Sequence, residues 1–277
     1  MNKTCPAIAL TIAGSDSGGG AGVQADLRSF AAFGVHGTCV ITAVTAQNTR
    51  EVSAIHVLPA ASLNAQLDAV LGDFRIGAIK IGMLATPMIV RAVAGALNRH
   101  PRIPVILDPV LVATTGARLA SSDLAAAMRK HLLARADLLT PNIPEAEQLL
   151  DRRIETTRDM HSAAVALLDR GARAVLLKGG HLRGNEVSDL LLARDGEHWF
   201  HQKRFRGEYH GTGCSLSAAI AAGVARGDAL DIAVGQAIDF VHDALAAGYR
   251  PGKGALRVLD HLAAARSCTA AEHSRPC

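Results

Sequence analysis

The run His210-Gly211-Thr212-Gly213-Cys214-Ser215 combines residue types that handle phosphate, and it lies at the start of an Ala-rich, strongly helical stretch. Its two glycines let the backbone approach a ligand closely. The N-terminus of the following helix directs unpaired N–H groups and about half a positive charge at the same point, which favours phosphate binding. A cysteine in the first turn of such a helix is expected to have a lowered pKa. The run therefore predicts a phosphate site with a reactive thiolate at Cys214.

A second glycine-rich segment, Gly14–Gly22, follows an apolar run and precedes a helical pattern. It lacks the Lys and Ser/Thr that end a Walker A loop, and its glycines do not fall as G-x-G-x-x-G. The segment therefore favours neither a P-loop ATPase nor a dinucleotide-binding protein. A flexible turn is the alternative interpretation, but five glycines in nine residues are more than a turn needs, and close approach to a ligand is preferred.

Polar residues follow several other apolar runs. Gln47 lies in the segment Thr45-Ala46-Gln47-Asn48-Thr49, and a side-chain amide offers the donor and acceptor that suit the edge of a heteroaromatic ring. A surface glutamine is an equally good interpretation of that residue alone. Asp108, Asn142 and Glu145 also follow apolar runs, and their oxygens suit Mg²⁺, often through water. Glu145 has the alternative of favouring a helix dipole from the first turn.

Lys178 ends a further apolar run. A lysine there can act as a point charge for a phosphate, which we prefer to a lysine whose stem lies along a sheet edge.

These residues need elements that bring them together, and short apolar runs alternate with helical patterns along nearly the whole chain. Gly34 and Gly171 are placed for helix C-caps, and Ser62 and Ser121 for N-caps. The expected strands are Ile8–Ala13, Cys39–Thr45, Ile79–Ile81, Val105–Asp108, Leu138–Thr140 and Ala174–Lys178. The expected helices are Val23–Phe33, Ser62–Asp73, Pro87–Asn98, Ser121–Leu133, Pro144–Leu150, Arg158–Arg170, Cys214–Ala225 and Leu230–Ala246.

This alternation predicts an α/β fold with a doubly wound, mostly parallel sheet and helices on both faces. Two β-like runs, Val187–Ala193 and His198–Arg204, flank Asp195-Gly196 and predict a hairpin, a small β element near the site. Ligands of such sheets bind beyond the carboxyl ends of the strands, where the polar residues lie. We expect a single domain over residues 1–262 and a flexible tail over 263–277.

Composition limits the partners. The net charge is only +4 and no Lys/Arg block is present, which disfavours nucleic acid. No run is long enough for a membrane span. The five cysteines form no Cys-x-x-Cys pair, which favours a reducing, cytoplasmic location.

Taken in order, the segments resemble the hydroxymethylpyrimidine and phosphomethylpyrimidine kinases of thiamine biosynthesis, in the ribokinase-like superfamily. No single segment is decisive, but the ordered set is specific and covers roughly residues 7–260. The matching segments are 13–26 (AGSDSGGGAGVQAD), 45–49 (TAQNT), 80–84 (KIGML), 108–110 (DPV), 142–145 (NIPE), 178–181 (KGGH) and 210–214 (HGTGC).

The resemblance implies that ATP phosphorylates 4-amino-5-hydroxymethyl-2-methylpyrimidine and then its monophosphate. It implies a substrate site made by Gln47, the Gly14–Asp16 segment, Ala21 and Met83. ATP phosphates and Mg²⁺ would be held by Asn142, Glu145 and Lys178, with Asp108 as a second metal ligand.

The resemblance also places an anion hole at the amides of Gly211, Thr212, Gly213 and Cys214. Cys214 would be the general base, where many ribokinase-like enzymes have an aspartate. A homodimer is implied.

Two alternatives stay open. Some members of this branch phosphorylate vitamin B6 rings, so a pyridoxal or pyridoxine kinase is the closest competitor, although the Gln47 segment favours a pyrimidine. A non-catalytic sensor is more remote because Lys178, Glu145 and Gly211–Cys214 are all present. The segment 112–116 (VATTG) departs from the Lys-Ser or Thr-Ser that many relatives have before this glycine. We expect that segment near the opening of the site.

Overall fold

The computed structural model describes residues 5–111 and 122–265. The main sheet contains β1 (Ile8–Asp16), β2 (His36–Gln47), β3 (Val52–Val57), β4 (Ala78–Ile81), β5 (Val105–Leu107), β6 (Leu138–Leu139), β7 (Ala174–Leu177), β8 (Glu186–Ala193) and β9 (Gly196–Lys203). The α-helices are α1 (Gly22–Ala32), α2 (Ala60–Asp73), α3 (Pro87–Arg99), α4 (Ser122–His131), α5 (Ile143–Leu150), α6 (Thr157–Asp169), α7 (Thr212–Arg226) and α8 (Leu230–Ala246).

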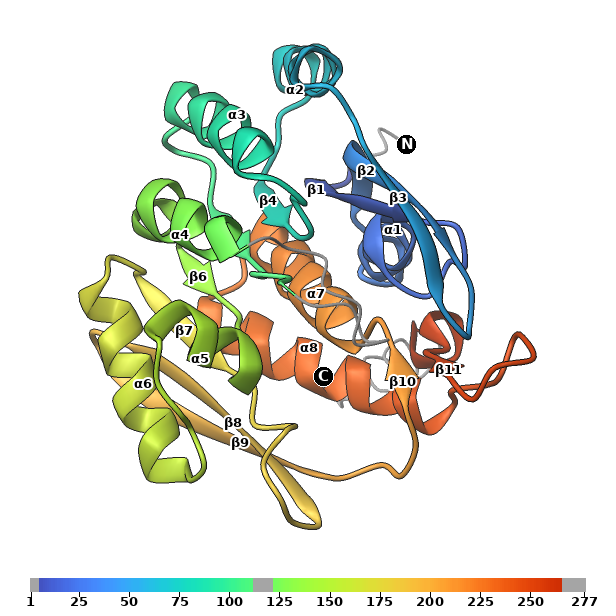
Figure 1. Cartoon of the computed structure of the whole chain (residues 1–277), viewed down its shortest axis with the longest axis vertical. Helices are drawn as coiled ribbons and strands as arrows, with labels where there is room; N and C mark the ends of the chain where they lie inside the picture. The colour runs from blue at the N-terminus through green and yellow to red at the C-terminus, as the bar shows by residue number, and fades with distance from the viewer. Residues whose placement is uncertain (1–4, 112–121, 266–277) are drawn as a thin grey trace, which may run out of the picture.

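The strands of this sheet lie in the order β3-β2-β1-β4-β5-β6-β7-β8-β9. Neighbours from β2 to β7 pair in parallel, whereas β3, β8 and β9 pair antiparallel at the two edges. The doubly wound, mostly parallel fold and the β8–β9 hairpin are therefore confirmed (Figure 1). The sequence analysis missed β3, a half-exposed edge strand, and the two-residue pair β10 (Tyr209–His210) and β11 (Arg257–Val258).

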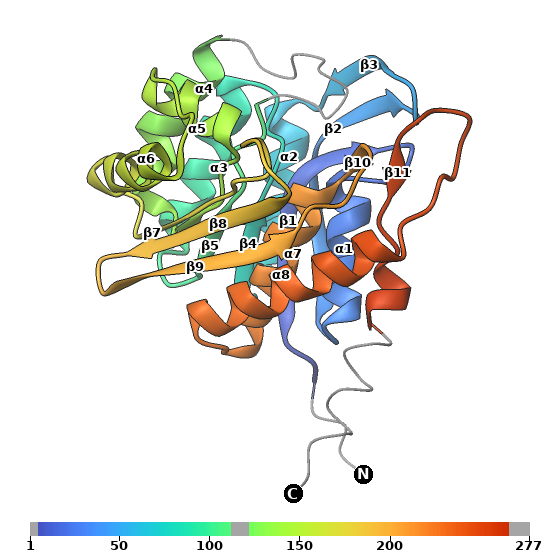
Figure 2. The same cartoon turned by 90° about the horizontal axis from the view of Figure 1, so that it is seen from below.

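Two apolar cores flank the sheet. Helices α2 to α6 cover one face with mainly Leu, Ile and Val side chains, and α1, α7 and α8 cover the other (Figure 2). The stretch Ala218–Ala222 of α7 is fully buried. Because alanine side chains are short, α7 packs closely under β1, β4 and β5. This packing brings the N-terminus of α7 to the carboxyl edge of the parallel strands.

Helix ends test the expected caps. Gly34 and Gly171 follow α1 and α6 with φ of 69° and 111°, as expected for glycines just past a helix. The N-cap expected at Ser62 is wrong, since α2 begins at Ala60 with Pro59 as its N-cap residue. A proline suits a helix start because its missing N–H has no partner there in any case. Ser121 lies outside the described residues.

The C-terminal boundary also differs. Residues 261–265 form a helical turn, and Ala264 is buried in the core beside α8, so the tail boundary placed at residue 263 is too early. Residues 266–277 lie outside the described part. Within the described ranges, we find no helix that is long and apolar enough to cross a membrane.

Candidate active site

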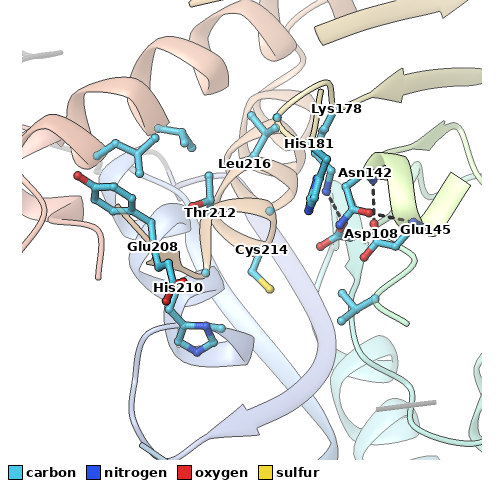
Figure 3. Close-up of a pocket in the computed structure, with 18 of the residues that line it drawn as sticks. Asp108, Asn142, Glu145, Lys178, His181, Glu208, His210, Thr212, Cys214 and Leu216 are labelled. Atoms are coloured by element: carbon cyan, nitrogen blue, oxygen red, sulfur yellow. Dashed lines mark hydrogen bonds and ion pairs between the residues drawn. The ribbon is translucent and has the colours of Figure 1, made fainter. Parts of the chain in front are cut away.

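A cavity of about 680 Å³ opens at the carboxyl ends of the parallel strands. The residues at its centre come from β10, α7 and the loops after β5, β6 and β7 (Figure 3). Every site residue predicted from the sequence lines this one cavity, namely Gly14, Asp16, Ala21, Gln47, Met83, Asp108, Asn142, Glu145, Lys178, Gly211, Thr212, Gly213 and Cys214. The predicted segment 112–116 lies outside the described residues.

The run at residues 210–215 forms the start of α7. Gly211 is the N-cap residue, with φ of 85°. A Cβ added to Gly211 would lie 1.8 Å from the carbonyl oxygen of Gly20, so only glycine fits where this run meets the glycine-rich loop. The amides at the start of a helix lack partners within the helix, and Gly211–Cys214 line the cavity. This arrangement can bind an anion.

A cluster of charged residues forms the wall of the cavity beside the start of α7. Lys178 Nζ is 3.0 Å from Asp108 Oδ1. Burial acts to lower the pKa of Lys178, but the charges of Asp108 and Glu145 together raise it. A Cβ added to Gly213 would lie 3.1 Å from Lys178 Nζ, so the ammonium reaches the start of α7. Lys178 is a charged cation beside the amides that can bind a phosphate.

Asn142 and Glu145 form a capping box at α5. The Asn142 side chain accepts from the Glu145 N–H at 2.9 Å, and Glu145 Oε2 accepts from the Asn142 N–H at 2.8 Å. The structural interpretation of Glu145 as a first-turn residue is thus correct, although the residue also lines the cavity. Burial and the Asp108 charge raise the pKa of Glu145 to about 7, against the opposing charge of Lys178.

Asp108 and Glu145 are the hard oxygen donors of this wall. Among the described residues, no group of three or more His, Cys, Asp or Glu side chains is arranged to hold a metal ion. Two carboxylates fit Mg²⁺ only when water and phosphate oxygens complete its coordination, which is the usual arrangement in nucleotide sites.

Cys214 lies in the first turn of α7 with its sulfur directed into the cavity (Figure 3). The lowered pKa expected for this thiol is wrong. Burial raises the pKa of Cys214 to about 11, and the carboxylates of Asp26 and Asp108 add to the rise, against the opposing charge of Lys80 and the N–H of Gly22. In this site, burial and nearby negative charge outweigh the two influences that lower the pKa, the charge of Lys80 and the Gly22 N–H.

Asp26 and Lys80 form a buried ion pair that the sequence analysis did not assign to the site. Lys80 Nζ lies 2.8 and 2.9 Å from the two Asp26 oxygens, and Thr11 Oγ1 donates to Asp26 Oδ2 at 2.6 Å. Both side chains are 0% exposed. A buried pair adds little stability over apolar residues, and its charges act on Cys214. Both residues are within the matched segments, which is the signal that could have found them.

The glycine-rich loop is ordered by Asp16. Its carboxylate accepts from the N–H groups of Gly18, Gly20 and Ala21 at 2.8 to 3.0 Å. Burial acts to raise the pKa of Asp16, but the hydrogen bonds from His210 and these amides together lower it. Asp16 therefore shapes the loop, and its oxygens are largely occupied by protein donors.

Gln47 and Met83 also line the cavity. The Met83 Cε atom lies 3.2 Å from the position of a Cβ on Gly14, so the methionine packs over a glycine that leaves it room. Gln47 contacts Thr45 Oγ1 at 3.2 Å and His210 Nε2 at 2.8 Å. The sequence analysis assigned no role to His210.

Asp189 on β8 was also missed. It lines the cavity and accepts from the Gly179 N–H at 2.7 Å. Burial raises the pKa of Asp189 to about 6, against that hydrogen bond and the Lys178 charge. The available signal was a carboxylate directly before the apolar run Leu190–Leu192 of β8.

Residues 16–259 match the family model described as phosphomethylpyrimidine kinase. The chain belongs to the phosphomethylpyrimidine kinase family. It is 48% identical over 248 residues to the hydroxymethylpyrimidine/phosphomethylpyrimidine kinase of Rhizobium meliloti, covering 88% of this chain and 92% of the relative.

Two solved structures show the same fold. The phosphomethylpyrimidine kinase of Clostridium difficile 630 has a TM-score of 0.78 at 36% identity, covering 86% of this chain and 99% of that one. The pyridoxal kinase of Staphylococcus aureus in complex with AMP-PCP and pyridoxal has a TM-score of 0.86 at 31% identity, covering 94% and 95%. The resemblance found in the sequence is confirmed, and the chain is a phosphotransferase of this family.

Proposed function

We propose that the chain transfers the γ-phosphoryl group of ATP to the hydroxymethyl group of 4-amino-5-hydroxymethyl-2-methylpyrimidine, and then a second phosphoryl group to the resulting monophosphate. The observation that carries the proposal is that the Gln47 amide, the N-terminus of α7 and Lys178 line one cavity. The names of the relatives support the choice of ring. We further propose that the protein acts in the cytoplasm as a homodimer, without a nucleic-acid partner.

The proposed reaction follows from the residues. The substrate hydroxyl oxygen forms a bond to the γ-phosphorus, the bond to the β–γ bridging oxygen breaks, ADP leaves, and the hydroxyl proton passes to Cys214. The N–H groups of Gly211–Cys214 and Lys178 hold the charge that develops on the transferred group, which is the main requirement of phosphoryl transfer. Mg²⁺, held by Asp108 and Glu145, would neutralise phosphate charge when bound with ATP.

The decisive experiment measures ATP turnover on the pyrimidine alcohol, its monophosphate and pyridoxal, with identification of each product. We expect both pyrimidines to be phosphorylated. Pyridoxal is the second candidate because the Staphylococcus aureus pyridoxal kinase matches this fold with a TM-score of 0.86 over 94% of this chain. Preferred turnover of pyridoxal would replace the proposal with that second function, and no turnover of any ring would favour a sensor.

Replacing Gln47 with alanine should raise the KM of the pyrimidine by about 5- to 30-fold, since one or two buried hydrogen bonds of about 1 kcal/mol each are lost. The KM of ATP should stay within about twofold, because the Gln47 side chain contacts Thr45 and His210 rather than the residues assigned to ATP. Steady-state kinetics with each substrate varied gives both values. Equal changes in the two KM values would contradict ring binding by Gln47.

Activity should rise with pH. A general base must be unprotonated, and the pKa of Cys214 is raised to about 11, so the thiolate fraction grows about tenfold per pH unit below that value. We expect kcat/KM to increase from pH 7 to pH 10. In Cys214→Asp, a carboxylate with a lower pKa should move the rising limb toward acid. A flat profile for the unmodified protein would argue against Cys214 as the base.

A further inference from the structure

We infer that His210 is a positioning residue that fixes the orientation of the Gln47 amide, and so sets the order in which a hydrogen-bond donor and acceptor face the substrate ring. This inference deepens the proposed function and rests on it. The geometry of four side chains carries it.

His210 is held tightly between the glycine-rich loop and Gln47. It is 8% exposed, and a Cβ added to Gly20 would lie 2.6 Å from His210 Cδ2. Its Nε2 atom is 3.0 Å from Asp16 Oδ2 and 2.8 Å from the Gln47 side-chain nitrogen. His210 directly precedes Gly211 in the chain. Its side chain therefore links the proposed anion hole at the start of α7 with the residues proposed to bind the substrate ring.

The Asp16 contact determines where the His210 proton lies. Asp16 accepts three backbone N–H groups, and the lowered pKa of its carboxyl keeps it ionised at neutral pH. An ionised carboxylate only accepts hydrogen bonds, so His210 Nε2 carries a proton. With the amide nitrogen of Gln47 toward His210, two donors would face each other at 2.8 Å.

The contact with Thr45, at the other end of the Gln47 amide, also disfavours this orientation of the amide. Thr45 has one hydroxyl proton, and its oxygen lies 3.1 Å from the Ser15 carbonyl oxygen and 3.2 Å from Gln47 Oε1. One proton cannot serve both acceptors fully. At the Thr45 end two acceptors therefore compete for one proton, and at the His210 end two donors face each other.

A half-turn of the amide removes the donor–donor contact at His210 and the competition for the Thr45 proton, because the amide oxygen and nitrogen exchange nearly identical positions. Gln47 Oε1 then accepts from His210 Nε2, whose single N–H is shared with Asp16 Oδ2. The Gln47 nitrogen donates to Thr45 Oγ1, and the Thr45 proton goes to the Ser15 carbonyl. Gln47 keeps one N–H and one oxygen lone pair for a ligand, in an order that His210 and Thr45 determine.

This order distinguishes the two candidate rings. Beside its hydroxymethyl group, the pyrimidine carries an amino donor and then a ring-nitrogen acceptor. Pyridoxal carries an aldehyde oxygen and then a phenolic hydroxyl at the same positions. The aldehyde oxygen only accepts where the pyrimidine amino group donates, and the hydroxyl can do either. An amide held in one orientation pairs with one ring and opposes the other, and buried groups without partners discriminate strongly.

The test compares His210→Phe, which keeps a ring of similar size, with His210→Gln, whose amide can return a donor near the Nε2 position. For each we measure kcat/KM for the pyrimidine alcohol and the competitive Ki of pyridoxal, which is defined even without pyridoxal turnover. The preference for the pyrimidine should fall at least tenfold in His210→Phe and recover at least partly in His210→Gln. The KM of ATP and the melting temperature serve as controls for folding.

A double-mutant cycle separates this role from a general structural one. If His210 acts through Gln47, then His210→Phe should change ring preference no further in a Gln47→Ala background. Unchanged preference in His210→Phe, or additive effects with Gln47→Ala, would overturn the inference. Failure of the unmodified protein to phosphorylate the pyrimidine would instead contradict the proposed function itself, and the inference with it.

Discussion

Replacing Cys214 with alanine is expected to lower kcat by about 100- to 10,000-fold, the range attributed to a lost general base. The thiol lines the cavity in the first turn of α7, where a substrate hydroxyl bound beside Gln47 and directed at the anion hole would meet it. Alanine keeps the backbone amide of residue 214, so the anion hole stays intact. ATP affinity, measured by calorimetry, should therefore change less than about threefold.

Cys39→Ala is the matched control. Cys39 is a partly buried free cysteine, and it lies on β2 rather than in the cavity. This variant should keep kcat within about twofold, as expected for a small change away from the site. If Cys214→Ala also kept near-normal kcat, Cys214 would be a residue selected for its size, and the proton would have another acceptor.

Replacing Gly211 with alanine is expected to abolish most turnover, by about 100-fold or more, because the start of α7 must move. An alanine at φ of 85° costs roughly 1–2 kcal/mol in itself. The added Cβ also meets the Gly20 carbonyl oxygen at 1.8 Å, and a backbone atom cannot give way as a side chain can. Displacing catalytic groups by about 1 Å is enough for a 100-fold loss.

The control variant Gly227→Ala separates the cost of the positive φ from the cost of the clash with the Gly20 carbonyl oxygen. Gly227 ends the same helix with φ of 94°, and nothing lies within 4 Å of an added Cβ. Gly227→Ala should lose roughly 1–2 kcal/mol of stability from its backbone conformation alone. It should keep the kcat of the unmodified protein. Thermal unfolding and steady-state kinetics on both variants give the comparison. Similar kcat values for Gly211→Ala and Gly227→Ala would show that the anion hole tolerates the displacement.

The sequence alone was sufficient for the order of the main elements and for many of the residues that line the cavity, although it missed Asp189 and gave no role to His210. Apolar periodicity depends on the local chain, and the carboxyl ends of parallel strands lie at one edge by topology, so Asp108, Asn142 and Lys178 could be expected together. Two-residue strands such as β10 and β11 carry no periodicity. The edge strand β3 was missed because it is half-exposed and mixes polar with apolar residues, so it carries no continuous apolar run.

The tertiary structure decided how the residues in the cavity act on one another. The direction of the Cys214 pKa shift depends on burial and on Asp26 and Asp108, which lie more than a hundred residues away in the chain. The local sequence shows only that the thiol lies at a helix N-terminus. The contact of His210 with Asp16 and Gln47 likewise joins segments remote in sequence. Electrostatic and hydrogen-bond effects depend on distance in space, so a local pattern identifies the groups and only the fold determines their states.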